Sequence, residues 1–593
     1  MKEIEIIRHS LSHVMAAAVK KLYPSVKIAI GPSIDNGFYY DFDCEDHSFS
    51  EEDFPAIERE MKKLIKSDGR FNHEVWSKEQ ANKFFADEPY KLELIEGIEG
   101  EEVNVYHFRE FTDLCKGPHV ESSKKLPRTS FKLDKTAGAY WRGDSDKKML
   151  QRIYALAFET DEALAEYIVM RAEQEKNDHR KLNNSLDLYV LTPEVGSGLP
   201  LWTEYGSVIR EELNFLAIEK ERKYGMHRVS TPHITKEATY LRSGHLPYYA
   251  EDMYAPVDVD DEKYYLKPMN CPHHHYIYAR KPWSYRDLPI RYTEYGTVYR
   301  YEASGGLSGL MRVRALTQDD IHIYCRHDQA LEEFRKVMHM HEEYYNIFGI
   351  GKDDFYLEFA LPDMDNLAKY VDDSEGWIKA MKIIEQVLDE EGLPYVKEEG
   401  EAAFYGPKVD FQVKSSTGVQ YSVSTNQLDI AASPRFNLTY KDKDGQDKNI
   451  YVIHAAPLGT HERFAGFLTE HFKGLFPVWL SPVQAMIVPV ADRHQEYADE
   501  VYDALFNARV YSATGGLRIE KDYTSERMQK KIRNATLRKI PYSIIVGDGE
   551  VENKTVSIRD RDGKQYNDIK IEDLTSKLKE LVESRDLSIE LGL

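Results

Sequence analysis

The sequence predicts an α/β protein of several domains, and three observations support that fold class. The chain has 593 residues, too many for a single core and enough for several domains of roughly 100–200 residues. Hydrophobic residues make up 42% of it, so large cores are feasible and wholesale disorder is excluded. Strand-like and amphipathic helical segments are mixed along the chain. We therefore expect a multidomain α/β protein.

The charge and cysteine content limit its partners and its compartment. The net charge is −23, and the mean field of such a chain repels phosphate, so any nucleic-acid partner must meet local basic patches. No stretch approaches the roughly 20 apolar residues that span a bilayer, so no membrane partner is expected. Four scattered cysteines are too few for a disulfide framework in so long a chain. Reduced thiols in a cytoplasmic protein fit better.

The first predicted domain covers residues 1–157. Strand-like runs at Val26–Ile30 and Gly37–Phe42 are mixed there with amphipathic helical segments such as Phe54–Ile65. Residues 158–186 keep a helical period at first and then become almost wholly polar. A helix that is polar all round usually bridges domains or stands in solvent, which predicts a linker helix over 158–186.

Two further domains are expected after the linker. Residues 187–480 form a large α/β region, and its β-rich segments are Ile290–Tyr301, Ile321–Tyr324, Val409–Val413 and Tyr421–Thr425. Residues 481–593 alternate strand-like and helical segments, which predicts a compact α/β domain. Basic residues gather in its helix after Ser525, and that face is either simply solvated or an RNA-facing surface.

The strongest chemical signal lies in residues 291–325. A predicted strand ends in Arg300-Tyr-Glu302, a glycine-containing loop follows, and the chain returns through Arg312 to a strand with Gln318, Asp320 and His322. Two arginines on opposing strands across such a loop can clamp a triphosphate and neutralise charge at the α-phosphorus. No Walker-type Gly-Lys-Ser/Thr occurs, so this is not a P-loop.

A second segment supports this interpretation over that of ordinary surface arginines on a hairpin. It reads "APLGTHERFAG", with Gly459, Glu462 and Arg463 at a turn that starts a helix. From there Arg463 could reach the far phosphates.

These segments carry a family resemblance. Residues 300–314 and 459–466, with the helix–strand segment that ends at Pro232, resemble the three signature motifs of class II aminoacyl-tRNA synthetases. The stretches "LKPMNCPHH", "GLMRVRALTQDDIHIYC", "FYGPKVDFQV" and "HAAPLGTHERF" are similar to the threonyl-tRNA synthetase family in particular. The resemblance covers essentially the whole chain.

The resemblance implies a fold and a reaction. It implies an α+β editing domain over 1–157, a linker helix over 158–186, a class II antiparallel-sheet catalytic domain over 187–480 and a C-terminal α/β anticodon-binding domain over 481–593. The implied reaction is the ligation of L-threonine to tRNA(Thr) with ATP, through threonyl-adenylate. The implied protein is a homodimer, with the segment ending at Pro232 at its interface.

The resemblance also assigns residues to ATP and to a metal. Arg300 would hold the α-phosphate, Glu302 the adenine amino group, and Arg312 and Arg463 the remaining phosphates, with Mg²⁺ assisting. The implied zinc ligands are Cys271, His322 and His454. No local spacing announces them, but one Cys and two His suit tetrahedral zinc with an open fourth position.

An open zinc position explains both selectivity and its limit. Zinc could take the amino and hydroxyl groups of threonine, with Asp320 also receiving the amine, so that valine would be rejected. Serine keeps the hydroxyl, and its binding free energy differs from that of threonine by only about 1–3 kcal/mol. Binding alone cannot exclude serine, so a second, hydrolytic sieve is needed.

The N-terminal region offers that sieve. His9 and His13 form an H-x-x-x-H pair on one helix face, and Cys115 and His119 form a C-x-x-x-H pair. Together they resemble the editing site that hydrolyses mischarged Ser-tRNA(Thr), and two further positions, Lys91 and Asp113, match it. By residue type alone the set could equally be a second zinc site, and spacing favours metal. The family resemblance favours hydrolysis by a positioned water, and the metal question stays open.

Other residues match further family positions. Gln318, Tyr405, Lys408 and Gln427 would line the threonine and adenylate pocket. His245 would relay the proton when the tRNA hydroxyl attacks, although a lone loop histidine is usually a surface residue. Glu552 and Arg561 sit where the family reads anticodon bases. His273, His274 and His275 are consecutive and cannot all face one metal, so we expect most of them to be structural.

The sequence departs from the family in three places. The chain starts directly at the editing domain, so we expect it to lack the small ubiquitin-like domain of many bacterial relatives. The stretch "SVSTNQLD" and His461 also differ from the commoner forms. Two rival functions are an RNA-binding regulator without activation and a class II enzyme for another amino acid. The retained arginines argue against the first, and the Cys271/His322/His454 set argues against the second.

Overall fold

The computed structural model describes residues 2–144, 146–364, 369–415 and 418–593, which form two compact units, Met1–Ala172 and Glu173–Leu593. The boundary lies within helix α5 (Asp161–Lys176), inside the predicted linker. Only Leu164 of α5 is buried, but α5 ends at Lys176, so the single linker helix expected over 158–186 is interrupted there. Helix α6 (His179–Leu186) completes this segment.

Unit 1 is built around one central helix. Helix α1 (Glu3–Leu22) buries Leu11, Val14, Met15 and Ala18 completely, at the spacing of one helix face, and packs on α2 and β3. The five-stranded sheet beside it runs β1-β3-β8-β7, with β2 paired to β3. Its strands are β1 (Lys27–Ile28), β2 (Ser33–Ile34), β3 (Gly37–Asp43), β7 (Phe131–Tyr140) and β8 (Met149–Ala157). Strand β3 confirms the predicted run at Gly37–Phe42.

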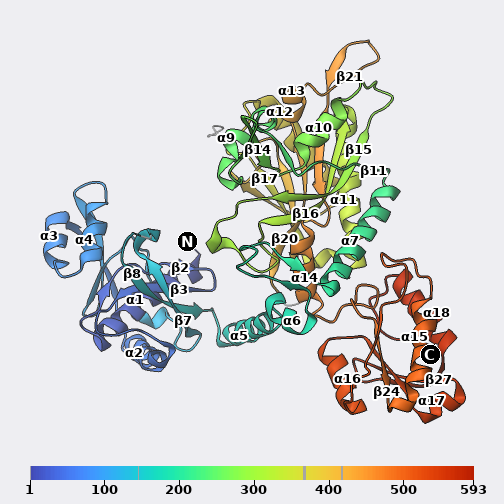
Figure 1. Ribbon diagram of the computed structural model, residues 1–593. Coiled ribbons are helices and arrows are strands. Elements are labelled where there is room, and N and C mark those ends of the chain that lie inside the picture. Colours follow the sequence, from blue (N-terminus) through green and yellow to red (C-terminus); the bar gives the residue numbers. More distant parts are fainter. Residues whose placement is uncertain (1, 145, 365–368, 416–417) are drawn as a thin grey trace. The chain divides into compact units, whose positions relative to one another are not determined.

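A smaller antiparallel sheet completes unit 1 (Figure 1). It contains β4 (Phe71–Ser77), β5 (Glu102–Phe108) and β6 (Phe111–Leu114). The remaining helices are α2 (Phe54–Lys66), α3 (Lys78–Phe84) and α4 (Pro89–Glu96). Helix α2 matches the predicted helix at Phe54–Ile65 and buries its apolar stripe. Helices are mixed here with strands whose pairings, over the described part of this unit, are antiparallel, as the predicted α+β class requires.

Unit 2 centres on an eight-stranded sheet in the order β11-β15-β16-β23-β20-β19-β17-β18, which is antiparallel except at its two edge pairs. The strands are β11 (His227–Arg228), β15 (Ile290–Tyr299), β16 (Ala315–Cys325), β17 (Phe355–Leu361), β18 (Tyr395–Glu399), β19 (Lys408–Lys414), β20 (Gln420–Asp429) and β23 (Tyr451–Ala456). The strands predicted near residues 290, 321, 409 and 421 are therefore confirmed. The strand predicted to end near Pro232 is shorter, because Thr231 beside it donates to Glu294 instead of joining the ladder.

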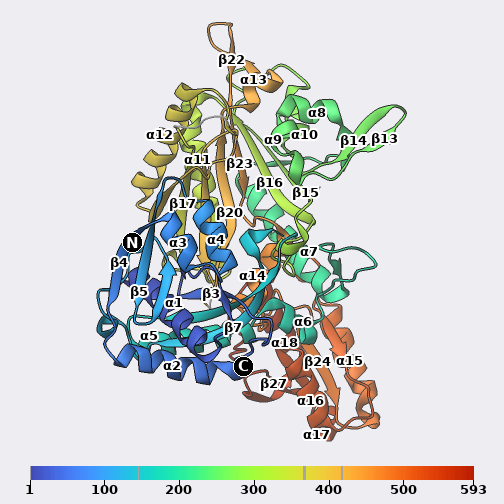
Figure 2. The same ribbon diagram turned by 90° about the vertical axis from the view of Figure 1, so that its left-hand side faces the viewer.

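Helices cover the two sides of this sheet differently. In Figure 2, α11 (Ala330–Ile347) and α12 (Ser374–Glu391) lie on one side and α8 (Glu237–Ser243), α9 (His245–Tyr248) and α10 (Cys271–Ala279) on the other. The α11 side carries the apolar core, with Ile321, Ile323, Ile453 and Ala455 buried in it. Two more helices, α7 (Glu204–Lys223) and α14 (His461–His471), pack against each other. The polar residues that alternate with the core residues are left for the opposite face.

The last part of unit 2 is a five-stranded sheet in the order β25-β24-β26-β27-β28. Its strands are β24 (Ala485–Pro489), β25 (Ile519–Lys521), β26 (Tyr542–Val546), β27 (Thr555–Asp560) and β28 (Gln565–Lys570). Its helices are α15 (Gln495–Phe506), α16 (Met528–Leu537), α17 (Asp548–Asn553) and α18 (Ile571–Glu583). A buried ion pair of 2.7 Å from Arg518 Nη1 to Glu212 Oε1 joins this part to α7. The predicted α/β arrangement is confirmed.

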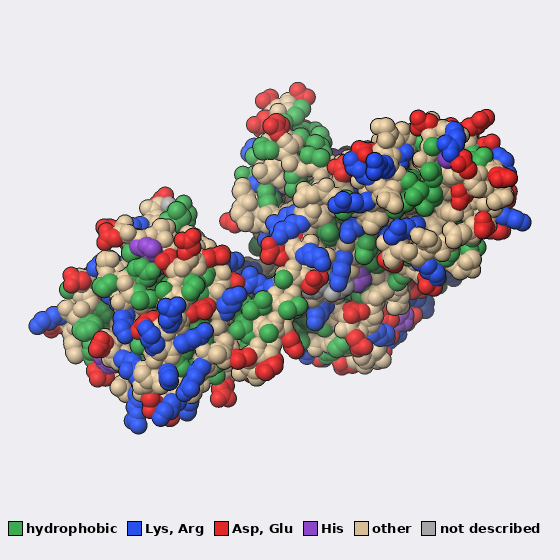
Figure 3. Space-filling model, turned by 90° about the horizontal axis from the view of Figure 1, so that it is seen from below, with side chains coloured by type: hydrophobic (Ala, Val, Ile, Leu, Met, Phe, Trp, Pro, Cys, Tyr) green, Lys and Arg blue, Asp and Glu red, His purple; other side chains and the backbone are tan. Residues whose placement is uncertain are grey.

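The surface carries both signs of charge. Figure 3 shows acidic and basic side chains intermingled over the visible face, with a dense group of Lys and Arg on the left-hand body, unit 1. Helix α2 of that unit exposes Lys62, Lys63 and Lys66. Local basic patches therefore exist despite the net charge of −23. Among the described residues, no helix is both long enough and apolar enough to cross a membrane.

Candidate active site

The register of the central sheet brings distant residues into one row. Lys408 lies opposite Gln427, Gln427 opposite His454, and His454 opposite His322, on four neighbouring strands. Residues two apart on a strand share a face, so Gln318 and Asp320 join His322 on β16. The antiparallel ladder thus lines up side chains that are more than 100 residues apart in sequence.

This row lines a cavity of about 510 Å³. Of the residues predicted for the catalytic domain, all except His245 line it: Cys271, Arg300, Glu302, Arg312, Gln318, Asp320, His322, Tyr405, Lys408, Gln427, His454 and Arg463. A cavity of this size falls in the range that holds a small-molecule ligand.

Three arginines make one end of the cavity an anion site. The Arg463 side chain is held by its Nε donating to Met311 O at 3.0 Å and its Nη1 donating to Ser422 O at 3.3 Å. Its pKa is lowered by burial and by the neighbouring charges of Arg300 and Arg312. Three cations held together in this way favour a polyanionic ligand such as a triphosphate.

The Glu302 carboxylate faces this arginine group. Arg312 Nε donates to Glu302 Oε2 at 2.8 Å, and the Glu302 backbone carbonyl accepts from Arg314. Arg312 is an exposed residue. A phosphate can therefore reach it from solvent.

Three side chains from separate segments form what we call the core set: Cys271, His322 and His454, all buried. Their ligand atoms lie within 4.8 Å of one another. Among the described residues, Nε2 of His322 has no hydrogen-bond partner, while Nε2 of His454 bonds Asp429 Oδ2 at 2.9 Å and leaves its Nδ1 for another ligand. A buried nitrogen without a partner is costly unless something binds it, so these donors fit a metal ion.

Neighbouring polar groups hold the core set in place. His274 Nδ1 lies 2.8 Å from His322 Nδ1, and its Nε2 bonds Glu294 Oε2 at 2.9 Å. Metal-binding histidines are normally oriented by such partners. Asn270 likewise donates to Asp320 Oδ2 at 2.9 Å. Residue 296 is a glycine, and this leaves room for Asn270, because a Cβ at that position would lie 2.4 Å from the Asn270 amide nitrogen.

Tyr405 and Lys408 belong to the same wall. The Tyr405 hydroxyl donates to Gln427 Oε1 at 2.5 Å, and Lys408 forms an ion pair with Asp410. Burial raises the pKa of Tyr405 well above its ordinary value, so its hydroxyl keeps its proton and acts as a donor.

His245 does not line the main cavity. It is 3% exposed, its Nδ1 bonds Ser243 Oγ at 2.8 Å, and its Nε2 lies 3.2 Å from Met269 Sδ. Burial, together with the charges of Arg300 and Arg435, lowers its pKa to about 3, so the ring is neutral. The structure places it behind the wall, against Met269, which does line the cavity.

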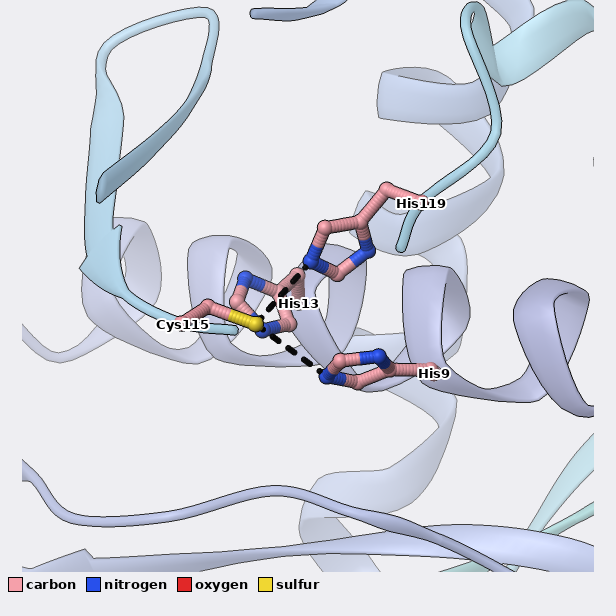
Figure 4. A group of neighbouring side chains, drawn as sticks. All are labelled: His9, His13, Cys115 and His119. Carbon is pink, nitrogen blue, oxygen red and sulfur yellow. Dashed lines mark hydrogen bonds between the residues drawn. The ribbon is translucent and has the colours of Figure 1, made fainter. Parts of the chain in front are cut away.

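A second cluster, the N-terminal set, lies in unit 1 and consists of His9, His13, Cys115 and His119 (Figure 4). His9 and His13 project from α1, while Cys115 and His119 lie on the segment after β6. Cys115 Sγ lies 3.3 Å from Nε2 of both His9 and His119. The two sequence pairs therefore meet, as the family resemblance implied.

Burial keeps this set uncharged. It raises the pKa of the Cys115 thiol to about 12 and lowers the pKa of His9. The pKa of His119 is lowered by burial and by His13 and His9. Nδ1 of His119 lies 3.2 Å from Ser10 Oγ, so both of its ring nitrogens have protein partners.

A buried ion pair lies next to the N-terminal set. Lys91 pairs with Asp113, and both side chains are about 2% exposed or less. The Tyr40 hydroxyl donates to Asp113 Oδ2 at 2.6 Å, and His13 Nδ1 lies 3.6 Å from the same oxygen. Lys91 and Asp113 therefore join the cluster, as the resemblance implied. A rigid charged pair beside neutral imidazoles can orient a water molecule or a substrate carbonyl.

The structure does not bring Glu552 and Arg561 together. Glu552 is exposed near the end of α17, before β27, and Arg561 follows the other end of that strand. A six-residue strand separates them by about 20 Å. Arg561 donates to the backbone carbonyls of Phe476 at 2.7 Å and Leu475 at 2.9 Å, so its guanidinium is engaged within the protein.

Several site residues were not predicted from the sequence. Asp429 holds His454, Asn270 holds Asp320, and Glu294 supports His274. For Asn270 and Asp429 the only sequence signal was their position next to residues already singled out. Asn270 precedes Cys271, and Asp429 is the last residue of the stretch "SVSTNQLD". His274 was expected to be structural, and it is buried as a partner of His322.

Comparison with known families defines the class of the protein. A family model described as "tRNA synthetase class II core domain (G, H, P, S and T)" matches residues 251–472, and one described as "Anticodon binding domain" matches 484–581. A third, "Threonyl and Alanyl tRNA synthetase second additional domain", matches 103–154. The catalytic sheet and its cavity are those of a class II aminoacyl-tRNA synthetase.

Comparison with individual proteins narrows this class. The chain is 47% identical to a threonine–tRNA ligase of Staphylococcus carnosus, over 94% of this chain and 84% of that one. It is 46% identical to a threonine–tRNA ligase of Deinococcus radiodurans, over 98% and 89%. A crystal structure of the RNA-binding domain of threonyl-tRNA synthetase from Cryptosporidium parvum matches with a TM-score of 0.62 and 32% identity, over 69% of this chain and 98% of that one. The chain belongs to the threonine–tRNA ligase family.

Proposed function

We propose that the cavity of unit 2 activates threonine with ATP and transfers it to tRNA(Thr), with roles assigned to individual residues. The single observation that carries this is the convergence of Arg300, Arg312 and Arg463 with the core set in one cavity. The arginines supply cations for the triphosphate, and the core set supplies donors for a metal that could bind the amino acid beside it.

In the activation step, the threonine carboxylate attacks the α-phosphorus of ATP and pyrophosphate leaves. Arg300 holds the α-phosphate, Arg312 and Arg463 hold the other phosphates, and Mg²⁺ accompanies ATP. Charge spreads over the phosphoryl oxygens in the transition state, and fixed guanidinium groups stabilise it without reorganisation. Glu302 receives the adenine amino group once Arg312 turns to phosphate.

The core set fits zinc, since one thiol and two imidazoles lie close enough to bind one ion and leave a fourth position open. When bound, zinc supplies a Lewis acid toward the amino and hydroxyl groups of threonine. Asp320 accepts a hydrogen bond from the threonine ammonium group, and Gln318, Tyr405, Lys408 and Gln427 line the remainder of the pocket. In the transfer step the terminal adenosine hydroxyl of tRNA attacks the adenylate carbonyl, the ester bond forms as the bond to AMP breaks, and the hydroxyl proton passes to the departing phosphate.

We assign His245 a supporting role, since its contact with Met269 supports the cavity wall. In the last domain we propose that Glu552 meets anticodon bases, because it is exposed. Arg561 then supports that domain through its two backbone bonds. We further propose a cytoplasmic homodimer, with domains at 1–157, 187–480 and 481–593 joined by the linker 158–186.

We propose that the N-terminal set hydrolyses mischarged Ser-tRNA(Thr). Neutral imidazoles can accept a proton from water, and the Lys91–Asp113 pair orients the ester. The close contacts between Cys115 and two histidines support a hydrogen-bonded pocket, since both ring nitrogens of His119 are already used.

Threonine-dependent ATP–pyrophosphate exchange tests the proposal. We expect exchange in the unsubstituted protein and a loss of roughly 100-fold or more in Arg463→Ala, because one fixed charge stabiliser is removed. Arg286→Ala is the matched control, since Arg286 is exposed and its guanidinium donates to the hydroxyl of the neighbouring Tyr285. Equal exchange in both variants, or exchange that serine or proline supports better than threonine, would overturn the assignment.

A further inference from the structure

A buried pair outside the cavity, His179 with Glu470, is not explained by the roles assigned above. His179 begins helix α6 in the linker segment, and Glu470 lies near the end of α14, the helix that also carries Arg463. Their side chains are 3% and 6% exposed, and Nδ1 of His179 lies 2.8 Å from Oε1 of Glu470. A buried charge is expensive unless paired, so the pair calls for an explanation.

Each member of the pair also holds a second segment of the protein. Nε2 of His179 accepts a hydrogen bond from the backbone N–H of Leu310 at 3.0 Å. The other carboxylate oxygen of Glu470 accepts from the Tyr421 hydroxyl, and burial together with Glu470 raises the pKa of that hydroxyl. The pair therefore bridges α6, α14, the loop after Glu302 and strand β20.

The residues that follow these two contacts are the ones that hold Arg463. Met311 comes directly after Leu310, and its carbonyl accepts from Arg463 Nε at 3.0 Å. Ser422 comes directly after Tyr421, and its carbonyl accepts from Arg463 Nη1 at 3.3 Å. Both backbone acceptors of this arginine thus lie one residue from a contact of the pair.

The packing leaves little freedom at this place. Gly309 has φ +48°, and a Cβ there would lie 2.1 Å from Nε2 of His179. A Cβ on Gly466 of α14 would lie 2.9 Å from Met311 Sδ. Both glycines allow the loop to press against α6 and α14, and a side chain at either position would displace it.

We infer that His179 and Glu470 position Arg463 for ATP, by fixing the two backbone carbonyls that orient its guanidinium. This rests on the proposed phosphate role of Arg463. The pair shares a group of metal-type donors with Asp178. A metal is a poorer explanation, because both ring nitrogens of His179 already have protein partners and the Asp178 carboxylate bonds Arg180.

Two amide substitutions of His179, each of which replaces one ring nitrogen, distinguish a positioning role of the residue from a packing role. The amide of His179→Asn falls near the former Nδ1 and can still donate to Glu470 but cannot reach Leu310. The amide of His179→Gln reaches the former Nε2 and can still accept from Leu310. We expect the KM for ATP in threonine-dependent exchange to rise roughly tenfold in His179→Asn and to stay within about threefold in His179→Gln, with the KM for threonine unchanged in both variants. Tyr421→Phe should raise the KM for ATP in the same direction.

Three comparisons keep the test decisive. Hydrolysis of pre-charged Ser-tRNA(Thr) should be unchanged in every variant, since the proposed editing site is in unit 1. His339→Asn, at an exposed histidine of α11, should leave threonine-dependent exchange unchanged. If His179 acts through Arg463, adding His179→Asn to Arg463→Ala should not lower the residual exchange of that variant further. Equal KM values for ATP in His179→Asn, His179→Gln and the unsubstituted protein, beside an impaired Arg463→Ala, would overturn the positioning role alone. An unimpaired Arg463→Ala would overturn the phosphate assignment instead.

Discussion

The core set in unit 2 and the N-terminal set in unit 1 use the same residue types in opposite ways. Each combines one cysteine with histidines whose ligand atoms lie within 4.8 Å of one another. In the core set the partners lie outside the cluster, namely Asp429 behind His454 and His274 behind His322, and among the described residues Nε2 of His322 has no hydrogen-bond partner. In the N-terminal set the members bond one another and Ser10. The surrounding hydrogen bonds, more than the residue types, decide which cluster suits a metal.

The reactivity of Cys115 provides the test with the largest expected effect. Its pKa is raised to about 12, so the thiolate fraction at pH 8 is roughly 2,000-fold lower than for an ordinary thiol, whose pKa is about 8.5. We expect alkylation by iodoacetamide to be slower than that of free cysteine by a comparable factor and to accelerate as the pH rises toward 10. Alkylation that becomes fast only after a chelator is added would mean that the thiolate had held a metal, and the contrast between the two sets would fail.

Removing the thiol of the core set should abolish activation. We expect Cys271→Ala to lose bound zinc, measured by elemental analysis, and to lose threonine-dependent exchange by roughly 100- to 1,000-fold. Cys325→Ala is the matched control, because Cys325 is buried in the same sheet and outside the core set. A Cys271→Ala protein that charges tRNA(Thr) at the normal rate would show that the core set is not needed.

Removing the thiol of the N-terminal set should affect editing alone. We expect Cys115→Ala to slow hydrolysis of Ser-tRNA(Thr) by roughly 100-fold, the usual scale for loss of a positioned proton-transfer group, with exchange unchanged. Cys44→Ala, at the half-buried cysteine of the same unit, serves as control. Normal hydrolysis in Cys115→Ala would remove the thiol from the proposed site.

The smallest expected effect comes from a partner outside the core set. Asp429→Asn keeps the side-chain shape but weakens the hold on Nε2 of His454, so we expect zinc affinity to fall roughly tenfold. A competition titration with a chromogenic chelator would measure it. The matched change in unit 1, Asp113→Asn, should leave zinc affinity unaltered and slow Ser-tRNA(Thr) hydrolysis. Equal zinc affinity in Asp429→Asn and unsubstituted protein would contradict the proposed role of the outer partner.

Sequence alone determined the local features. The helical spacing of His9 and His13 put both on one face of α1, and the alternation of Gln318, Asp320 and His322 put them on one face of β16. Such patterns depend on the periodicity of one segment, which a few neighbouring residues specify. The helical character of residues 161–176 and the mixed α/β character of the last domain followed from the same kind of signal.

Only the tertiary structure decided which distant groups meet and which predicted site residues lie outside the cavity or bond to the backbone instead. The ladder register aligned His322 with His454, and packing placed His245 behind the cavity wall and turned Arg561 toward backbone carbonyls. Packing also buried His179 between Leu310 and Glu470, where sequence offered only a polar linker. The reason is physical: register and burial are set by the whole core, and a buried polar group takes whichever partner the fold brings within reach.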